Sequence, residues 1–343
     1  MGPDMAKILL TGGAGYIGSH TYVGLVEAGY DVVILDNFSN AKADVPARLE
    51  RITGQPVTVY RGDVLDRALL DRVFAEHRID GVVHFAALKA VGESTQRPLD
   101  YIHTNVGGLL TLLSAMDAAG VRRIVFSSSA TVYGETDIQP IPEDHPRTYT
   151  SPYAYTKITG ELTLEQVVAA DPRWAVGVLR YFNPVGAHKS ALIGEDPADL
   201  PNNLMPYIAK VATGDLPRLR VFGDDYDTPD GTGVRDYIHV EDLADGHVLS
   251  IAALIETGES HAVNLGTGKG SSVLDVVRAY SEACGRDLPY DIVGRRDGDV
   301  AVLTARPEKA RDVLGFEAKR SLEDMCRSSW AWVSGQLSND LKP

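Results

Sequence analysis

Three side chains near the middle of the chain have the types and spacing of a proton-transfer unit. Tyr153 and Lys157 are four residues apart, so on a helix they lie on the same face, one turn apart. A phenol has a pKa of about 10, and a neighbouring ammonium group stabilises the phenolate and lowers that pKa. Ser129 follows an apolar run, 123–126, that is typical of a buried strand. Its hydroxyl is therefore expected at the carboxyl end of a parallel sheet, where such sheets bind ligands. This combination predicts proton transfer at a carbinol or carbonyl group.

The tyrosine–lysine spacing also occurs by chance on helix surfaces, where it is an exposed pair without function. A cofactor site would decide between the two interpretations, and the N-terminus predicts one. An apolar strand at 7–11 leads into Gly12, Gly15 and Gly18, a helical pattern follows to residue 28, and a second strand ends in Asp36. This order is typical of the βαβ unit that binds dinucleotides.

Each residue of this unit has a physical task. Gly12 permits the tight turn, Gly15 lets backbone N–H groups approach a pyrophosphate, and Gly18 lets the helix pack closely on the strand. The helix N-terminus adds partial positive charge. The carboxylate of Asp36 accepts hydrogen bonds from ribose hydroxyls and repels a 2′-phosphate, which favours NAD over NADP. The glycine spacing, G-x-x-G-x-x-G, differs from the usual G-x-G-x-x-G.

Strands and helices then alternate, with strands expected at 57–60, 81–85, 123–126 and 175–179 and helices at 68–77, 98–119 and 152–169. The alternation predicts an α/β fold with a doubly wound parallel sheet (a Rossmann fold) and a smaller C-terminal substrate-binding lobe. We expect residues 5–187 and 234–258 to form the NAD-binding domain, and 188–233 and 259–343 to form the lobe. Asp63 follows a strand, where it suits an adenine amino group or, equally, a helix N-cap.

Charge and composition exclude several classes of function. The formal net charge of −14 argues against non-specific binding to nucleic acids or anionic membranes. No apolar run approaches the roughly 20 residues of a membrane span, and the expected location is the cytoplasm. Cys284 and Cys326 are interpreted as buried thiols. The nine histidines have no metal-ligand spacing, so no metal site is expected.

Many separate motifs resemble the UDP-glucose 4-epimerases, which are extended short-chain dehydrogenases/reductases. The most specific stretches are residues 85–94, FAALKAVGES, and 233–240, GVRDYIHV. The resemblance is spread from near the first residue to about Trp332. It implies an isomerase that interconverts UDP-glucose and UDP-galactose by inversion at C4, through a transient 4-keto sugar and a bound NAD.

The resemblance also implies roles for individual residues. Tyr153 is the acid/base, Lys157 lowers its pKa and holds the nicotinamide ribose, and Ser129 bonds to the 4-hydroxyl of the sugar. Besides these three and the glycines, the residues that would hold NAD are Tyr16, Ile17, Asp36, Asn37, Asp63, Val64, Phe85, Ala86, Ala87, Leu88, Lys89, Asn105 and Phe182. Those that would hold the UDP-sugar are Lys89, Asn183, Asn203, Leu204, Val221, Phe222, Arg235, Arg296 and Asp299.

The chemistry of arginine independently supports the assignment of Arg235 and Arg296 to the UDP moiety. Guanidinium groups match pyrophosphate oxygens, and an acidic protein needs local positive charge to bind an anionic ligand. The alternatives are a structural pair of Arg235 with Asp236 or Asp242, and a solvated charge for Arg296. Among related activities, the 4,6-dehydratases need an Asp-Glu pair after the serine or threonine, and the decarboxylases need a glutamate. Here those positions are Ala130 and Thr131. A catalytically silent NAD-sensing protein is the third alternative, but such proteins usually lack the tyrosine or the lysine.

One departure from the family affects the range of sugars. A position that gates the sugar pocket is tyrosine in family members restricted to UDP-hexoses, and here it is Leu303. We expect partial tolerance of UDP-GlcNAc and UDP-GalNAc; the alternative is that the leucine only packs the lobe. The family also suggests a homodimer formed through helices 99–119 and 152–169, although the apolar run 109–113 fits a protein core equally well.

Overall fold

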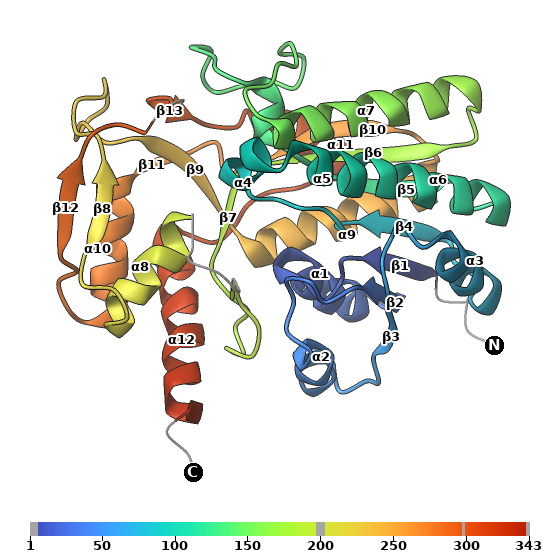
Figure 1. Cartoon of the computed structure of the whole chain (residues 1–343), viewed down its shortest axis with the longest axis horizontal. Coiled ribbons are helices and arrows are strands. Elements are labelled where there is room, and N and C mark those ends of the chain that lie inside the picture. Colours follow the sequence, from blue (N-terminus) through green and yellow to red (C-terminus); the bar gives the residue numbers. More distant parts are fainter. Residues whose placement is uncertain (1–5, 197–202, 297–298, 341–343) are drawn as a thin grey trace.

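The computed structural model describes residues 6–196, 203–296 and 299–340, and it shows two parts side by side (Figure 1). The larger part is built on a seven-stranded sheet in which every neighbouring pair of strands is parallel. In spatial order the strands are β10 (His261–Leu265), β6 (Ala175–Tyr181), β5 (Arg123–Ser129), β4 (Gly81–His84), β1 (Lys7–Thr11), β2 (Asp31–Asp36) and β3 (Thr58–Arg61). The predicted doubly wound α/β fold is confirmed.

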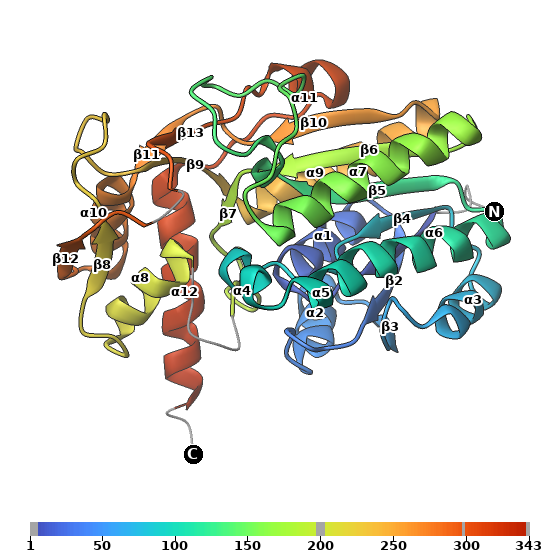
Figure 2. The ribbon, with the colours of Figure 1, turned by 45° about the horizontal axis from the view of Figure 1, so that its top comes forward.

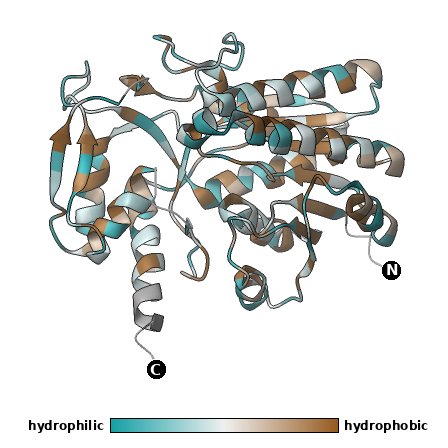
Figure 3. Ribbon diagram, in the orientation of Figure 1, coloured by the Kyte–Doolittle hydropathy of each residue, from teal (hydrophilic) through white to brown (hydrophobic). Residues whose placement is uncertain are grey.

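Helices cover both faces of this sheet, as Figure 2 shows. One layer consists of α1 (Tyr16–Glu27), α2 (Val45–Thr53), α9 (Val240–Thr257) and α11 (Glu308–Leu314), and the other of α3 (Arg67–Glu76), α6 (Gly108–Ala119) and α7 (Pro152–Ala170). The strands supply apolar side chains to both layers in alternation: Ile8 and Leu10 pack into the first core, and Leu9 packs into the second. Such strands are hydrophobic along their length, and hydrophobic residues concentrate in this sheet in Figure 3.

The segment between β4 and β5 is helical over the predicted range 98–119, but it includes a π-helical turn and a preceding short helix that were not predicted. It contains α4 (Val91–Gln96), α5 (Pro98–Tyr101), a π-helical turn η1 (Ile102–Gly107) and then α6. Asn105 lies in the π-helical turn and bonds to backbone atoms of Leu88, the residue that follows β4 by four positions. Single π-helical turns are often found at functional sites. A 3₁₀ turn, η2 (Ala130–Tyr133), follows β5 directly.

The smaller part has its own core, in which helices pack against two short sheets. One sheet joins β11 (Gly270–Ser272), β9 (Val234–His239) and β13 (Val302–Leu303), with β7 (Asn183–Val185) also on β9; the other pairs β8 (Leu219–Phe222) with β12 (Tyr290–Val293). The helices are α8 (Leu204–Thr213), α10 (Val273–Cys284) and α12 (Leu322–Asp340). This core contains Cys326, which is buried, and Cys284 packs against it half-buried. Both cysteines are free thiols.

The two parts exchange chain segments at different points from those predicted. Strand β9, assigned to the NAD-binding domain, pairs with β7, β11 and β13 of the smaller part, while its Ile238 and the helix after it pack into the core of the large part. Strand β10, assigned to the lobe, is an edge strand of the large sheet beside β6, and α11 packs on the same core. Both strands are short and mix apolar with polar residues, so their sequences could not indicate which sheet each joins.

Candidate active site

A cavity of about 1130 Å³ lies between the two parts, where the carboxyl ends of the large sheet meet the lobe. It is lined from the large part by the glycine turn and the loops after the strands, and from the lobe by β7, β8, β9 and the start of α8. The predicted site residues that line it are Gly12, Gly15, Tyr16, Ile17, Gly18, Asp36, Asn37, Asp63, Val64, Phe85, Ala86, Ala87, Leu88, Lys89, Ser129, Tyr153, Lys157, Phe182, Asn183, Asn203, Leu204, Phe222, Arg235, Arg296 and Asp299.

The glycine turn has the geometry of a phosphate cradle. Gly12 has a φ of 72°, and a Cβ there would lie 2.7 Å from the backbone nitrogen of Ala86. At Gly18 a Cβ would lie 2.4 Å from the carbonyl oxygen of Gly12, so the helix approaches the strand as closely as predicted. The first turn of α1 begins at Gly15 without a side-chain cap. Its backbone N–H groups therefore face the cavity as donors for an anionic group.

At the end of β2, the carboxylate of Asp36 is oriented by two backbone donors. One oxygen accepts from the N–H of Ala14 at 2.9 Å and the other from the N–H of Phe38 at 2.8 Å. Burial raises the pKa of Asp36, and the backbone hydrogen bonds oppose that rise. Each oxygen keeps a lone pair for a hydroxyl donor, so the residues present fit the ribose of a dinucleotide.

The alternative role of Asp63 as a helix N-cap is wrong. Asp66 occupies that position and accepts a hydrogen bond from the N–H of Leu69. Asp63 instead lines the cavity, accepting from the Asn37 side chain at 2.8 Å and from the backbone of Leu65 at 2.9 Å. Two predicted cofactor residues, Asn37 and Asp63, are thus joined directly.

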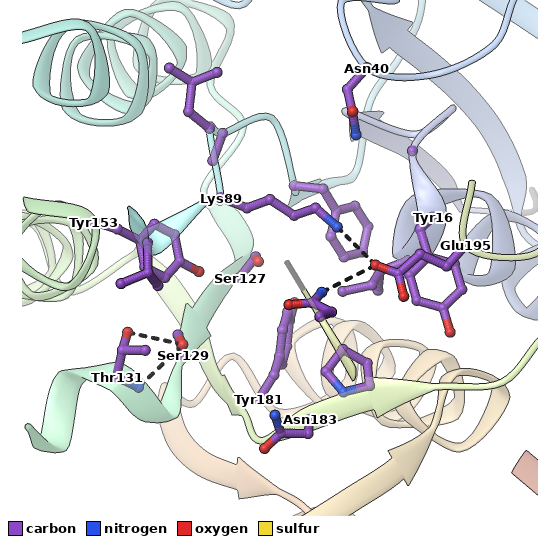
Figure 4. A pocket seen from close by; sticks show the side chains of 18 of the residues that line it. Tyr16, Asn40, Lys89, Ser127, Ser129, Thr131, Tyr153, Tyr181, Asn183 and Glu195 are labelled. Carbon is purple, nitrogen blue, oxygen red and sulfur yellow. Dashed lines mark hydrogen bonds and ion pairs between the residues drawn. The ribbon is translucent and has the colours of Figure 1, made fainter. Parts of the chain in front are cut away.

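The predicted proton-transfer residues all line the cavity, and Ser129 and Tyr153 lie side by side on one wall (Figure 4). Ser129 is the last residue of β5, and its Oγ accepts from the N–H of Thr131 at 3.2 Å and from its hydroxyl at 3.0 Å. Ser151 caps the start of α7, and the helix presents Tyr153 and Lys157 on one face. The ammonium nitrogen of Lys157 lies 5.7 Å from the Tyr153 ring and donates to the carbonyl of Ser127 at 2.6 Å.

The pKa of the phenol differs from the prediction. Burial raises the pKa of Tyr153 to about 12, and the hydrogen bond with Ser129 opposes this only in part. Burial also lowers the pKa of Lys157 to about 8. Burial therefore outweighs any lowering of the phenol pKa by the lysine, because the removal of water disfavours both charged forms. Additional positive charge in the cavity would be needed to form the phenolate near neutral pH.

On the opposite wall, arginines enter the cavity from the lobe. Arg235 of β9 donates to Asp299 at 2.9 Å, so two predicted substrate residues pair with each other. The proposed partner Asp236 is fully buried and accepts instead from the backbone of Thr267, Gly268 and Ala305. The other one, Asp242, pairs with Arg320. The guanidinium of Arg296 stacks 4.4 Å from the ring centre of Phe222, which fixes an otherwise exposed side chain over the cavity.

Three predicted site residues do not line the cavity. Val221 is fully buried in the lobe core, because alternation along β8 gives the cavity to Phe222. Leu303 packs into a cluster with Phe182. The side chain of Asn105 is buried and bonds to the backbone of Leu88 and to the hydroxyl of Thr156. Asn105 therefore positions the loop 85–89 against α7 and does not line the cavity itself.

Comparison with known proteins agrees with this geometry. A model described as "NAD dependent epimerase/dehydratase family" matches residues 8–266. The chain belongs to this family. It is 54% identical over 331 residues to a UDP-glucose 4-epimerase of Bacillus subtilis, across 96% of this chain and 98% of that protein.

Two solved structures of the family are similar over almost the whole chain. One, a UDP-glucose 4-epimerase from Stenotrophomonas maltophila with bound NAD and formylated UDP-arabinopyranose, is 49% identical with a TM-score of 0.96, over 97% of this chain and 99% of that one. The other is the UDP-Glc/GlcNAc 4-epimerase from Campylobacter jejuni, 34% identical with a TM-score of 0.85, over 96% and 99%. The resemblance noted from the sequence is confirmed.

Glu195 is a cavity residue that could not be predicted from the sequence and that joins two predicted ones. The Glu195 carboxylate accepts from Lys89 at 3.4 Å and from Asn203 at 3.3 Å, and thus links two predicted ligand residues across the cavity (Figure 4). Its backbone carbonyl accepts from the indole of Trp332 at 3.2 Å. The only signal in the sequence was the turn-rich stretch around it, which does not indicate a binding role.

Proposed function

We propose that this protein interconverts UDP-glucose and UDP-galactose by inversion at C4 through a transient 4-keto sugar, with NAD as its cofactor. The observation that carries the proposal is that three groups of residues with different chemistry line one cavity. Proton-transfer residues lie on one wall, arginines that suit a diphosphate lie on the other, and a dinucleotide cradle lies between the strand ends. The full-length similarity to UDP-glucose 4-epimerases supports the same activity.

In this account Tyr153 removes the proton of the 4-hydroxyl and later returns it. Ser129 lies beside the phenol and, oriented by Thr131, shares its hydrogen bond with the reacting oxygen. Lys157 holds the nicotinamide ribose and stabilises the phenolate electrostatically. A bound NAD would supply the acceptor and donor for the hydride at C4, and its oxidised form would add positive charge near the buried phenol.

Inversion requires that the nucleotide end stays fixed while the sugar turns. Arg235, Arg296 and Asp299, with Asn183, Asn203, Leu204 and Phe222, would hold the UDP moiety. Guanidinium groups bind diphosphate oxygens through charge-assisted hydrogen bonds. A keto sugar held mainly through this end can present its other face to the cofactor, and the return of hydrogen then gives the opposite configuration at C4.

Leu303 supports the further proposal that UDP-GlcNAc and UDP-GalNAc are partly tolerated. Its side chain is smaller than tyrosine and packs behind the cavity, against the cluster that contains the cavity residue Phe182, so a larger tyrosine there would take room from the sugar end. The C. jejuni relative is named as a UDP-Glc/GlcNAc epimerase. We expect Leu303→Tyr to lower the ratio of N-acetyl to plain-hexose turnover; an unchanged ratio would contradict the proposal.

We also propose that the protein is a cytoplasmic homodimer. No helix in the described part of the chain is long and apolar enough to cross a membrane. Helices α5, α6 and α7 lie on the same side of the large part (Figure 1). Each has a large exposed apolar residue: Leu99 is 77% exposed, Leu110 48% and Leu162 44%. A second copy would cover them. Sedimentation should give twice the chain mass, and a monomer at all concentrations would refute this.

The direct test of the activity is to incubate the purified protein with UDP-galactose and to measure UDP-glucose, first without and then with added NAD. Product in both arms supports the proposal and shows that NAD is retained on purification. Product only with NAD supports the activity with weaker retention. No product in either arm from a folded protein would overturn the proposal.

A further inference from the structure

A buried carboxylate lies directly behind the proton-transfer residues. Glu161 follows Lys157 by one turn of α7 and is 1% exposed. One of its oxygens accepts from Arg180 Nε at 2.9 Å and from the hydroxyl of Ser128 at 2.5 Å. The other accepts from Arg180 Nη2 at 2.7 Å and from Arg147 at 3.1 Å. All of these donors use the same carboxylate, so it is saturated with partners.

The partners of Glu161 are themselves fixed. Arg180 of β6 is buried and donates its remaining N–H groups to the hydroxyl of Tyr133 at 2.9 Å and to the carbonyl of Glu143 at 2.8 Å. This bidentate, buried pairing holds the pKa of Glu161 below its ordinary value, so it remains a carboxylate. Removing one partner of such a network leaves an uncompensated buried charge.

The network touches the reaction machinery through strand β5. Ser128, which donates to Glu161, lies between Ser127, whose carbonyl holds the Lys157 ammonium, and Ser129 of the proton-transfer unit. Ser128 is also the register partner of Arg180 in the sheet. Glu161 therefore connects α7, β5 and β6 at the level where all three residues of the unit are positioned.

Glu161 also determines the charge around Lys157. The titratable side chains that interact with this lysine are His84 on β4, and Tyr153 and Glu161 on its own helix. Tyr181 on β6 lines the same cavity. Burial lowers the pKa of His84 to about 3, so it is neutral. Of these groups, Glu161 is the one that bears negative charge at neutral pH, and its charge raises the pKa of Lys157 against the effect of burial.

We propose that Glu161 is a positioning residue of the epimerisation: it aligns Ser129, Tyr153 and Lys157 through the β5–β6–α7 network and supplies the negative charge that keeps Lys157 protonated. This inference rests on the proposed function, because it assigns those three residues to the reaction. It predicts an effect on the pH dependence of turnover that a purely structural side chain would not have.

The test compares pH–rate profiles of the parent with Glu161→Gln and with Glu161→Asp. Turnover should fall at alkaline pH as Lys157 loses its proton. In Glu161→Gln this fall should move to lower pH by about one unit, with about a fivefold loss of kcat at pH 8. Glu161→Asp keeps the charge, so its profile should stay close to that of the parent. The control is Glu165→Gln, one turn further along α7, whose side chain is 54% exposed and also pairs with Arg147; solvent screens it, so its profile should match the parent.

Arg147→Gln gives a second test if Glu161→Gln does not fold. It removes a half-buried positive charge from the same carboxylate, so the alkaline fall should move to higher pH, opposite to the Glu161→Gln shift. Unshifted profiles in folded variants, or shifts in the same direction for both, would overturn the inference while leaving the epimerase activity intact. Absence of epimerase activity in the parent would instead refute the proposed function.

Discussion

The arginine wall gives a quantitative prediction for Arg235→Gln. The side chain is 15% exposed and is held by Asp299 at 2.9 Å, so its guanidinium is directed into the cavity before substrate binds. A hydrogen bond to a charged group contributes about 1.5–3 kcal/mol. Because Arg235 is partly exposed, the lower part of that range, about 1.5–2 kcal/mol, applies, which corresponds to about 10- to 30-fold. Contacts to the diphosphate have the same strength in the bound substrate and in the transition state at C4. Their loss should therefore raise KM and leave kcat nearly unchanged.

The assay is steady-state turnover of UDP-galactose together with inhibition by free UDP, whose inhibition constant should rise by the same factor as KM. The matched control is Arg295→Gln. This neighbouring arginine pairs with Asp225 at 2.7 Å, stacks 4.0 Å from the ring centre of Tyr226 and does not line the cavity. Equal effects of the two variants, or a loss confined to kcat, would refute the reasoning.

Two further predictions concern the cofactor cradle. Gly12→Ala should lower thermal stability and reduce bound NAD severalfold. A left-handed non-glycine residue costs about 1–2 kcal/mol, and the added Cβ would lie 2.7 Å from the backbone of Ala86. An unchanged melting temperature and NAD content would contradict this prediction. Asp36→Asn should weaken NAD binding to the cofactor-free protein and reduce the preference for NAD over NADP, because the charge that repels a 2′-phosphate is gone. Fluorescence titration with both nucleotides measures the ratio of the two dissociation constants. An unchanged ratio would show that Asp36 does not determine the preference.

The large sheet could be predicted because its strands are apolar runs bounded by glycines and alternate with helices. The strand from Lys7 to Thr11 was predicted to the residue, and the helix at Pro152 within one residue. The assignment of β9 and β10 to the two sheets could not be predicted, since pairing partners far apart in sequence decide it. Helix α2 and the short strands of the lobe were missed for a related reason, because segments this short carry little periodic signal.

Within the site, motif spacing brought most of the predicted residues to one cavity, but it could not indicate side-chain direction or solvation. Alternation along a four-residue strand hides Val221 and exposes Phe222. The amide of Asn105 is satisfied by a loop that only the folded structure brings near it. The raised pKa of Tyr153 depends on how completely the ring is buried, and Glu195 enters the site through an irregular segment.

The central claim is that the Tyr153 phenol moves the proton of the 4-hydroxyl, and Tyr153→Phe tests it most directly. Removal of one hydroxyl leaves the ring in place, so NAD content and UDP affinity should remain close to those of the parent. General acid–base groups typically contribute 10²–10⁴-fold, and we expect the interconversion of UDP-galactose and UDP-glucose to slow by about that factor. A folded, NAD-loaded Tyr153→Phe protein that interconverts the two sugars as fast as the parent would contradict the account.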